Sequence, residues 1–293
     1  MKMKNNKMSV SRRNFLGMSS SAIVGFSILG INACNRKSET YVTVVAYNVL
    51  KFTGWPAENM PDKSQMPKLM AEELTKYSPD IINFSESPDE SVVRSVADLL
   101  NMNYAFLPSG GNWPGAVLTR FEIVNSENAP LINKPRPEDL FTRHWGKVVI
   151  ELPNKELISV HSAHLYPHDN PVSAEIRQRE IAEIIKSMES DIQSNNSILV
   201  IGDLNHTPAM PEYNQWMNAG LKDTYAVSGI GDGLTIRADT PSKRIDFILA
   251  AGPIAEQIIE SKALFEGAFR TNPLDPESYA LSDHLPQYAK FKI

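Results

Sequence analysis

The sequence predicts an α/β fold in which two packed sheets, flanked by helices, build one domain. Three observations lead to this prediction. Apolar runs with strand character recur from Tyr41 to the end of the chain, and several follow one another directly. Amphipathic segments with helical spacing lie between the others. No repeat, low-complexity tract or internal linker divides the series, so we expect packed sheets under helical layers in a single domain.

The first half of the domain mixes both element types. Residues 41–50 are rich in β-branched side chains, which indicates a buried strand. Apolar residues at helical spacing predict a helix over 66–77, which Pro79 ends before a strand at 80–85. The same spacing predicts a second helix over 92–100. Short apolar runs predict further strands at 104–108, 116–119, 147–152 and 157–163.

The second half continues with longer gaps between strands. Isoleucines and Met188 at helical spacing predict a third helix over 176–188. The run at 197–201 indicates another buried strand, and 211–219 a short helix that Gly220 ends. Strands at 244–250 and 287–293 complete the domain.

Composition indicates an ordinary globular chain and argues against a nucleic-acid-binding surface. The 293 residues are 42% hydrophobic and 22% charged, which excludes a disordered chain and suffices for a large core. Residues 1–33 contain basic but no acidic side chains, so the remainder has 24 basic against 34 acidic residues and a formal net charge of −10. Long-range attraction to a polyanion is therefore not expected.

The N-terminus is predicted to be an export address that is separate from the fold. Arg12 and Arg13 precede a weakly apolar run at 22–31, and Cys34, the only cysteine, follows it. The segment 1–34 resembles a twin-arginine export signal joined to a bacterial lipoprotein cleavage box. A membrane anchor is the weaker interpretation, because the apolar run is shorter than the ~20 residues of a spanning helix. We therefore expect a lipid on Cys34, a tether at 35–40, and residence at the bacterial cell envelope, on its periplasmic or surface side.

Acidic, amide and imidazole side chains stand at the ends of the predicted strands, where a rigid backbone can hold them toward a cleft. Divalent cations such as Mg²⁺ prefer oxygen ligands, which the carboxylates of Glu86 and Asp283 can supply. Phosphoester hydrolysis also needs an activated water and hydrogen-bonding groups around the phosphoryl oxygens. No cysteine cluster or closely spaced histidine pair suggests zinc. The full set is Asn48, Glu86, His164, Asp203, Asn205, Asp246, Asp283 and His284.

Seven segments, taken in order, resemble the endonuclease/exonuclease/phosphatase superfamily of DNase I-like, metal-dependent phosphoesterases. Each segment alone is weak evidence, since turn acids and core histidines are common in proteins. Their joint occurrence across residues 41–293, in the right order, is specific. The segments are 47–49, 79–82 with Glu86, 115–121, 162–165, 202–205, 244–248 and 282–286.

The resemblance implies a four-layered α/β sandwich, with two packed, mostly antiparallel sheets between helices, and a Mg²⁺ site at one end; Mn²⁺ is the alternative ion. The family position that matches Glu86 binds the metal. The positions that match Asn48 and Asp283 support it or lie near it. These three residues are therefore our candidate metal ligands.

The same resemblance implies the catalytic candidates. Asp203 and Asn205 match the pair that activates water and steadies the phosphate. His284 matches a phosphate-contacting histidine, which the carboxylate corresponding to Asp246 orients. His164 matches the second histidine on the phosphate. Family members divide the roles of base and electrophile differently, so the general base stays open at this point.

Some residues depart from the family pattern or carry a plainer interpretation. Ser85 and Glu180 replace frequent glutamines, and His206 after Asn205 is an uninterpreted variation. These departures place the chain away from the best-known nuclease branches. We expect His161 to be packed and His144 and His168 to be loop residues. For Trp113, in the glycine-rich loop 110–115, a packed position is favoured over a substrate-facing one.

These inferences describe an exported, lipid-anchored, Mg²⁺-dependent hydrolase that cleaves a phosphodiester or phosphomonoester by metal-assisted attack of water. We expect a small phosphoester substrate and a monomer. The net charge disfavours a secreted nuclease, and the lack of a long apolar hairpin disfavours a sphingomyelinase-like lipid phosphodiesterase. A surface-binding lipoprotein without catalysis is the alternative from another class. The complete acid, amide and histidine set argues against it.

Overall fold

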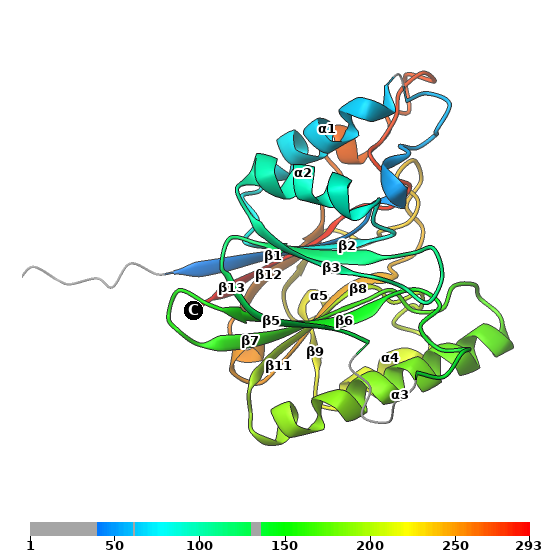
Figure 1. The fold of residues 1–293 in the computed structure, drawn as a ribbon. Helices are drawn as coiled ribbons and strands as arrows, with labels where there is room; N and C mark the ends of the chain where they lie inside the picture. The colour runs from blue at the N-terminus through cyan, green and yellow to red at the C-terminus, as the bar shows by residue number, and fades with distance from the viewer. Residues whose placement is uncertain (1–39, 61, 130–135) are drawn as a thin grey trace, which may run out of the picture. The chain divides into compact units, whose positions relative to one another are not determined.

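Two β-sheets pack face to face between layers of helix (Figure 1). The structure is a computed structural model that describes residues 40–60, 62–129 and 136–293. The predicted signal, Cys34 and all of the tether except Thr40 lie outside the described residues. The sheets and helices belong to the unit Glu39–Ile293, which is distinct from Met1–Ser38.

The first sheet has seven strands, with β1 (Tyr41–Asn48) at its middle. β1 pairs in parallel with β2 (Ile81–Ser85) and antiparallel with β13 (Gln287–Lys292). The segments that follow β1 and β2 and the one that precedes β13 therefore meet at one edge. The strand order is β10-β12-β13-β1-β2-β4-β3, with β3 (Asn103–Leu107), β4 (Gly115–Thr119), β10 (Gly229–Ile230) and β12 (Ile258–Ala263).

The second sheet has six strands, with β8 (Ser197–Asp203) buried along its whole length. β8 pairs in parallel with β7 (Leu157–Ala163) and antiparallel with β11 (Asp246–Ala251). The end of β8 thus lies beside the start of β11 and the end of β7. The order is β5-β6-β7-β8-β11-β9, with β5 (Glu122–Asn128), β6 (Trp145–Glu151) and β9 (Lys222–Asp223).

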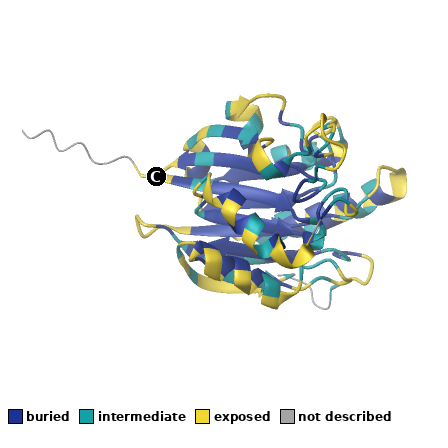
Figure 2. Ribbon diagram, turned by 90° about the horizontal axis from the view of Figure 1, so that it is seen from above, coloured by how far each residue is buried: buried dark blue, intermediate teal, exposed yellow. Residues whose placement is uncertain are grey.

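Helices cover the outer face of each sheet (Figures 1 and 2). α1 (Met66–Thr75) and α2 (Glu90–Leu100) lie on the first sheet, and α3 (Pro171–Gln193) and α4 (Pro211–Asn218) on the second. This arrangement confirms the predicted four-layered sandwich of mostly antiparallel sheets. The shorter elements are α5 (Thr224–Ser228) and 3₁₀ turns at Leu50–Phe52, Lys63–Gln65, Pro253–Glu256 and Gly267–Phe269.

The central strand β1 serves two cores at once. Val44 and Ala46 point into the core between the sheets, whereas Val45 and Tyr47 point into the core under α1 and α2. A strand buried on both faces reads as a continuous apolar run, which explains why the sequence marks it so clearly. Among the described residues, no helix has both the length and the apolar character that a membrane crossing needs.

Sequence reasoning missed strands whose side chains carry little apolar pattern. β5 is exposed at all but one position, and β12 alternates only at its end. Without a buried face, such a strand lacks the alternation that identifies strands in a sequence. α3 is also longer than expected, because it begins at a capped turn in which the side chain of Asn170 accepts a hydrogen bond from Ser173 N–H at 3.0 Å.

Candidate active site

Two carboxylates meet where β8 ends and β11 begins. The antiparallel register sets Asp246 opposite Asp203. Gly202, with φ of +139°, allows β7 and β8 to approach closely, because a Cβ there would lie 2.0 Å from the carbonyl oxygen of Ala163. His164 follows Ala163 directly, so a strand-end histidine is brought beside the two acids.

Asp203 lies at the centre of the cluster. Asn48 donates its side-chain amide to Oδ2 of Asp203 at 3.0 Å, and the backbone N–H of Asn205 donates to Oδ1 at 3.0 Å. Burial of the side chain, reinforced by the charge of Asp246, raises the pKa of Asp203 above its usual range. A carboxylate whose pKa is raised toward neutrality is a better proton acceptor while still ionised near neutral pH.

An acid–imidazole pair faces the same carboxylate. Nδ1 of His284 lies 2.8 Å from Oδ2 of Asp246, and its Nε2 lies 3.8 Å from Oδ2 of Asp203. Burial works to lower the pKa of His284, but the neighbouring carboxylates, Asp246 first, outweigh it and raise the pKa to about 10. His284 is therefore an imidazolium near neutral pH, and Asp246 orients it.

His164 approaches Asp203 from the other strand end. Its Nε2 lies 3.5 Å from Oδ2 of Asp203, and its backbone N–H donates to the carbonyl of His144 at 2.9 Å. Burial, helped by the charges of His144 and Arg143, holds the pKa of His164 well below its usual range. The ring is therefore neutral, and one oxygen of Asp203 faces two imidazoles of different charge.

Glu86 and Asp283 form the acidic side of the cluster, and both are half-buried. Burial raises the pKa of Glu86, and the charge of Asp283 adds to the effect. A hydrogen bond from Asn48 and the charge of His284 oppose it. Glu86 also has a left-handed backbone, with φ of 50°, which costs about 1–3 kcal/mol in a residue with a Cβ.

Asn205 ties two of the strand ends together. Its side-chain amide donates to the carbonyl oxygen of Leu165 at 3.0 Å, while its backbone N–H bonds to Asp203. Its φ of 52° is left-handed, as at Glu86. The structure thus brings all eight candidate residues to the same end of the two sheets.

The oxygen donors of the cluster fit a hard divalent cation. Among the described residues, Asp203, Asp246 and His284 each place one ligand atom within 4.8 Å of the others. Nδ1 of His284 is already bonded to Oδ2 of Asp246 at 2.8 Å, so this group offers few free ligand atoms to a metal. Glu86, Asp283 and Asn48 offer carboxylate and amide oxygens instead, and a cation there would offset the burial and repulsion that raise the pKa of Glu86.

The fold and the cluster match known proteins. The model of the Endonuclease/Exonuclease/phosphatase family matches residues 45–284, a range that contains all eight candidate residues. The chain belongs to this family. Family members are hydrolases that act on phosphoesters, and the geometry of the site fits such a hydrolase.

Several solved structures share the fold of this family member. A family protein from Bacteroides thetaiotaomicron is 15% identical, with a TM-score of 0.67 over 87% of this chain and 98% of that chain. A family protein from Bacteroides vulgatus is 17% identical, with a TM-score of 0.66 over 87% and 99%. A mannosyl-6-phosphatase from Bacteroides thetaiotaomicron is 15% identical, with a TM-score of 0.65 over 85% and 98%.

Two serines that sequence reasoning did not assign hold the site together. Ser282 donates its hydroxyl to the carbonyl oxygen of Asn48 at 2.7 Å and accepts from the N–H of His284 at 3.3 Å. Ser85, noted only as a departure from the family pattern, accepts from the N–H of Asp203 at 3.4 Å. Ser282 thereby links the first strand to the last segment of the domain, and its place beside Asp283 was the only sequence signal.

The other histidines are mostly structural. His144 lies in a loop, as predicted, yet it is fully buried with Nε2 2.9 Å from Oγ of Ser162, and burial lowers its pKa to about 3. His161 is packed, as predicted, and accepts a hydrogen bond from the indole N–H of Trp145 at 3.2 Å. His168 is an exposed loop residue, as predicted.

The remaining departures from the family pattern act as supports. Glu180 accepts hydrogen bonds from the backbone N–H groups of Phe141 at 2.7 Å and Tyr166 at 2.8 Å, so it braces the loop that follows His164. His206 is buried and accepts from the indole N–H of Trp216 at 3.1 Å. It is therefore a core residue under α4.

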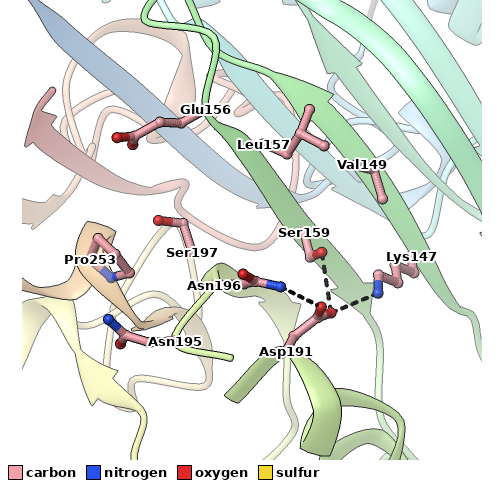
Figure 3. A pocket seen from close by; sticks show the side chains of 10 residues that line it. All are labelled: Lys147, Val149, Glu156, Leu157, Ser159, Asp191, Asn195, Asn196, Ser197 and Pro253. Atoms are coloured by element: carbon pink, nitrogen blue, oxygen red, sulfur yellow. Dashed lines mark hydrogen bonds and ion pairs between the residues drawn. The ribbon is translucent and has the colours of Figure 1, made fainter. Parts of the chain in front are cut away.

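A cavity of about 410 Å³ lies away from this site (Figure 3). Asp191 points into it and accepts hydrogen bonds from Lys147 at 2.7 Å and Asn196 at 3.0 Å. Its lining includes Ser197 at the start of β8, whereas Asp203 ends that strand, about 20 Å further along at ~3.3 Å per residue. Asp191, the acid at its centre, is thus bonded to its neighbours, and we assign the cavity no chemistry.

Proposed function

We propose that this protein is a Mg²⁺-dependent phosphoesterase that hydrolyses a phosphomonoester or phosphodiester by attack of an activated water, with Mn²⁺ as the alternative ion. The observation that carries the proposal is the buried carboxylate of Asp203, one oxygen of which faces neutral His164 and charged His284. A proton acceptor beside a hydrogen-bond donor and an imidazolium supports acid–base chemistry on a phosphate.

Each side chain has a defined task in this proposal. Asp203 accepts a proton from the attacking water, while Asn48 and the backbone of Asn205 keep its oxygens in place. His284, held protonated by Asp246, donates a hydrogen bond to a phosphoryl oxygen and stabilises the charge that develops there.

The remaining candidates bind the phosphate and the ion. Neutral His164 donates to a second phosphoryl oxygen without adding charge. Glu86, Asp283 and Asn48 would hold Mg²⁺, which would supply Lewis-acid stabilisation of the phosphate. In the overall reaction the water oxygen bonds to phosphorus and the ester P–O bond breaks. The leaving alkoxide takes a proton from solvent to become an alcohol, and Asp203 releases to solvent the proton that it accepted, so one water is consumed.

A small phosphoester is the proposed substrate. The net charge of −10 beyond residue 33 disfavours a long polyanion. The fold is also shared with a mannosyl-6-phosphatase, which supports a phosphomonoester. The test is turnover of the purified protein, with Mg²⁺ titrated, on p-nitrophenyl phosphate, bis(p-nitrophenyl) phosphate, sugar and inositol phosphates, nucleotides, sphingomyelin and plasmid DNA.

The panel separates the competing functions. We expect Mg²⁺-dependent turnover of a small ester, slow or absent cleavage of duplex DNA, and loss of activity in the Asp203→Asn control. Efficient plasmid cleavage at physiological salt would support a nuclease instead. No turnover of any substrate with Mg²⁺ or Mn²⁺ would overturn the proposal and leave a binding lipoprotein.

We further propose that the protein is exported and anchored to the cell envelope through a lipid on Cys34. The order of Arg12, Arg13, apolar run and Cys34 supports this, and the several acyl chains of a lipoprotein bind membranes firmly. Cys34→Ser should release the protein without lowering its specific activity. Fractionation and the mass of the mature N-terminus test this; Cys34 found unmodified and still joined to residues 1–33 would contradict it.

A further inference from the structure

Two cations and a tryptophan stand beside the catalytic cluster without an assigned role. Nζ of Lys51 lies 4.1 Å from the centre of a Trp113 ring, and the guanidinium carbon of Arg143 lies 4.5 Å from it. All three side chains are half-buried, so Trp113 is less packed than its sequence suggested. Within the described part of the chain, neither cation forms an ion pair, and Nε of Arg143 is buried without an acceptor.

Backbone hydrogen bonds hold Lys51, and the segment that contains Trp113, beside Glu86. The N–H of Lys51 donates to the carbonyl oxygen of Glu86 at 2.8 Å. The N–H of Ser87 donates at 2.8 Å to the carbonyl oxygen of Pro114, the residue after Trp113. The segment of Lys51 is therefore bonded to the backbone of Glu86, a candidate metal ligand, and the segment of Trp113 is bonded to the residue that follows Glu86.

Arg143 reaches the cluster from the other sheet. It precedes His144, whose carbonyl oxygen accepts from the backbone of His164 at 2.9 Å. The charge of Arg143 is felt by Glu86 and Asp203, and it contributes to the low pKa of His164. The guanidinium thus lies near the proposed site of reaction.

The backbone around Lys51 is strained. Leu50, Lys51 and Phe52 have φ values of 45°, 51° and 59°, three successive left-handed residues with side chains. Left-handed backbone is costly in a residue with a Cβ and persists only where the surrounding structure enforces it, and such strain gathers at ligand-binding positions. Together with its hydrogen bond to Glu86, this turn fixes Lys51 beside the cluster.

The two cations point to an anionic ligand rather than a stacked base. Acidic residues outnumber basic ones by 34 to 24 beyond residue 33, yet neither Lys51 nor Arg143 forms an ion pair with an acidic residue that the structure describes. Partly buried charges without counter-ions are costly until an anion arrives. Because the cations already lie over its ring, Trp113 serves to position them and is hindered as a stacking surface.

We propose that Lys51, Arg143 and Trp113 form a subsite for a second phosphate of the substrate. The inference rests on the proposed function and narrows its substrate class to small phosphoesters that carry another phosphate besides the scissile one. Arginine offers paired N–H groups and lysine a compact charge, a combination that suits the several oxygens of a phosphate.

Binding of non-hydrolysable ligands tests the subsite without turnover. The probes are propane-1,3-, butane-1,4- and hexane-1,6-bisphosphonate, each compared with the alkylphosphonate of the same length, by calorimetry on the purified protein at saturating Mg²⁺. We expect at least one bisphosphonate to bind roughly tenfold or more tightly than its monophosphonate, because charge-assisted hydrogen bonds supply that much. The series of lengths covers different separations of the two phosphates.

Substitutions assign the preference to these side chains. Lys51→Met and Arg143→Met should each reduce the bisphosphonate preference, measured as the ratio of bisphosphonate to monophosphonate affinity, several-fold or more. Lys155→Met, which removes an exposed lysine paired with Glu151, is the matched control and should change neither affinity. Melting temperatures check that each variant is folded.

The outcomes separate this inference from the proposed function. If no bisphosphonate in the series is preferred by the wild type, or if the preference survives both substitutions, the subsite is wrong. Turnover of simple monoesters in that case would leave the proposed function standing. A wild-type preference that both substitutions remove, in a protein that hydrolyses no ester, would keep the subsite and reject the hydrolase.

Discussion

Asp203 and Asp191 are two acids with opposite surroundings, one at the end of β8 and the other at the cavity beside its start. Both oxygens of Asp191 are satisfied, since Lys147 and Asn196 donate to them at 2.7 and 3.0 Å. At the other end, the imidazoles of His164 and His284 stand 3.5 and 3.8 Å from one oxygen of Asp203, too far for short hydrogen bonds. Both oxygens of Asp203 also accept a hydrogen bond at 3.0 Å, from Asn48 and from the backbone of Asn205. The difference is the pair of imidazoles, which face Asp203 without a short contact.

The same contrast extends to the neighbours of each acid. Around Asp203, Nδ1 of His164 and Oδ1 of Asp246 are buried without partners in the described part of the chain. Glu86 and Asn205 add left-handed backbone. Buried polar groups are almost always paired, and strained residues persist only where the structure requires them. A cavity such as that of Figure 3 is therefore weaker evidence of function than buried polar atoms without partners and residues with strained backbone.

The largest expected effect separates the two acids directly. Asp203→Asn should lower kcat by roughly 10²–10⁴, the usual contribution of a general base, in a folded protein because the substitution is nearly isosteric. Asp191→Asn is the matched control and should leave kcat unchanged. Steady-state kinetics on the best substrate of the panel, with circular dichroism of both variants, makes the comparison. Equal losses of kcat in the two variants would contradict the assignment of a catalytic role to Asp203 alone.

The next effect concerns the acidic side of the site. Glu86→Gln should weaken Mg²⁺ binding by roughly tenfold or more and lower the rate, because it removes a charged oxygen ligand. Activity is measured against Mg²⁺ concentration and after excess chelator, which should abolish it. Glu156→Gln, at the distant cavity, should leave the titration unchanged. Full turnover in chelator, or activity with zinc alone, would contradict the metal assignment.

A smaller effect tests whether Asp246 acts through His284. Asp246→Ala, His284→Ala and the double variant should show non-additive losses, with a coupling of roughly 0.5–3 kcal/mol in activation free energy, because an orienting carboxylate works only through its imidazole. The 2.8 Å contact between the two side chains is the basis for this expectation. The measurement is kcat/KM for the four proteins, and additive losses would reject the pairing.

The smallest expected effect concerns Asp191, at the cavity beside the start of β8. Lys147→Met removes an ion pair with Asp191 whose side chains are 23% and 17% exposed, so we expect the free energy of unfolding to fall by about 1 kcal/mol without a change in kcat. Urea denaturation measures it. Lys155→Met, with a side chain 79% exposed, should cost less. A large loss of rate in Lys147→Met would show that the cavity contributes to function.

Much of the fold could be predicted because buried strands and amphipathic helices have recognisable patterns of apolar residues in the sequence. β1 and β8 read as continuous apolar runs, since β1 is apolar on both faces and β8 is buried along its whole length. The exposed β5 and the short β9 and β10 leave no such pattern and were missed. The site candidates were also recognisable, because each stands within a predicted strand or in a short segment that adjoins one.

The sequence by itself determined which residue types stand at the strand ends, and with them the class of chemistry, because oxygen donors and imidazoles in that order have few other uses. Only the tertiary structure decided their states. The charge of His284, the neutrality of His164 and the raised pKa of Asp203 arise from burial and from carboxylates distant in the chain. The pairing of Lys51 and Arg143 over Trp113 was equally hidden, because it depends on two sheets meeting, which local pattern does not encode.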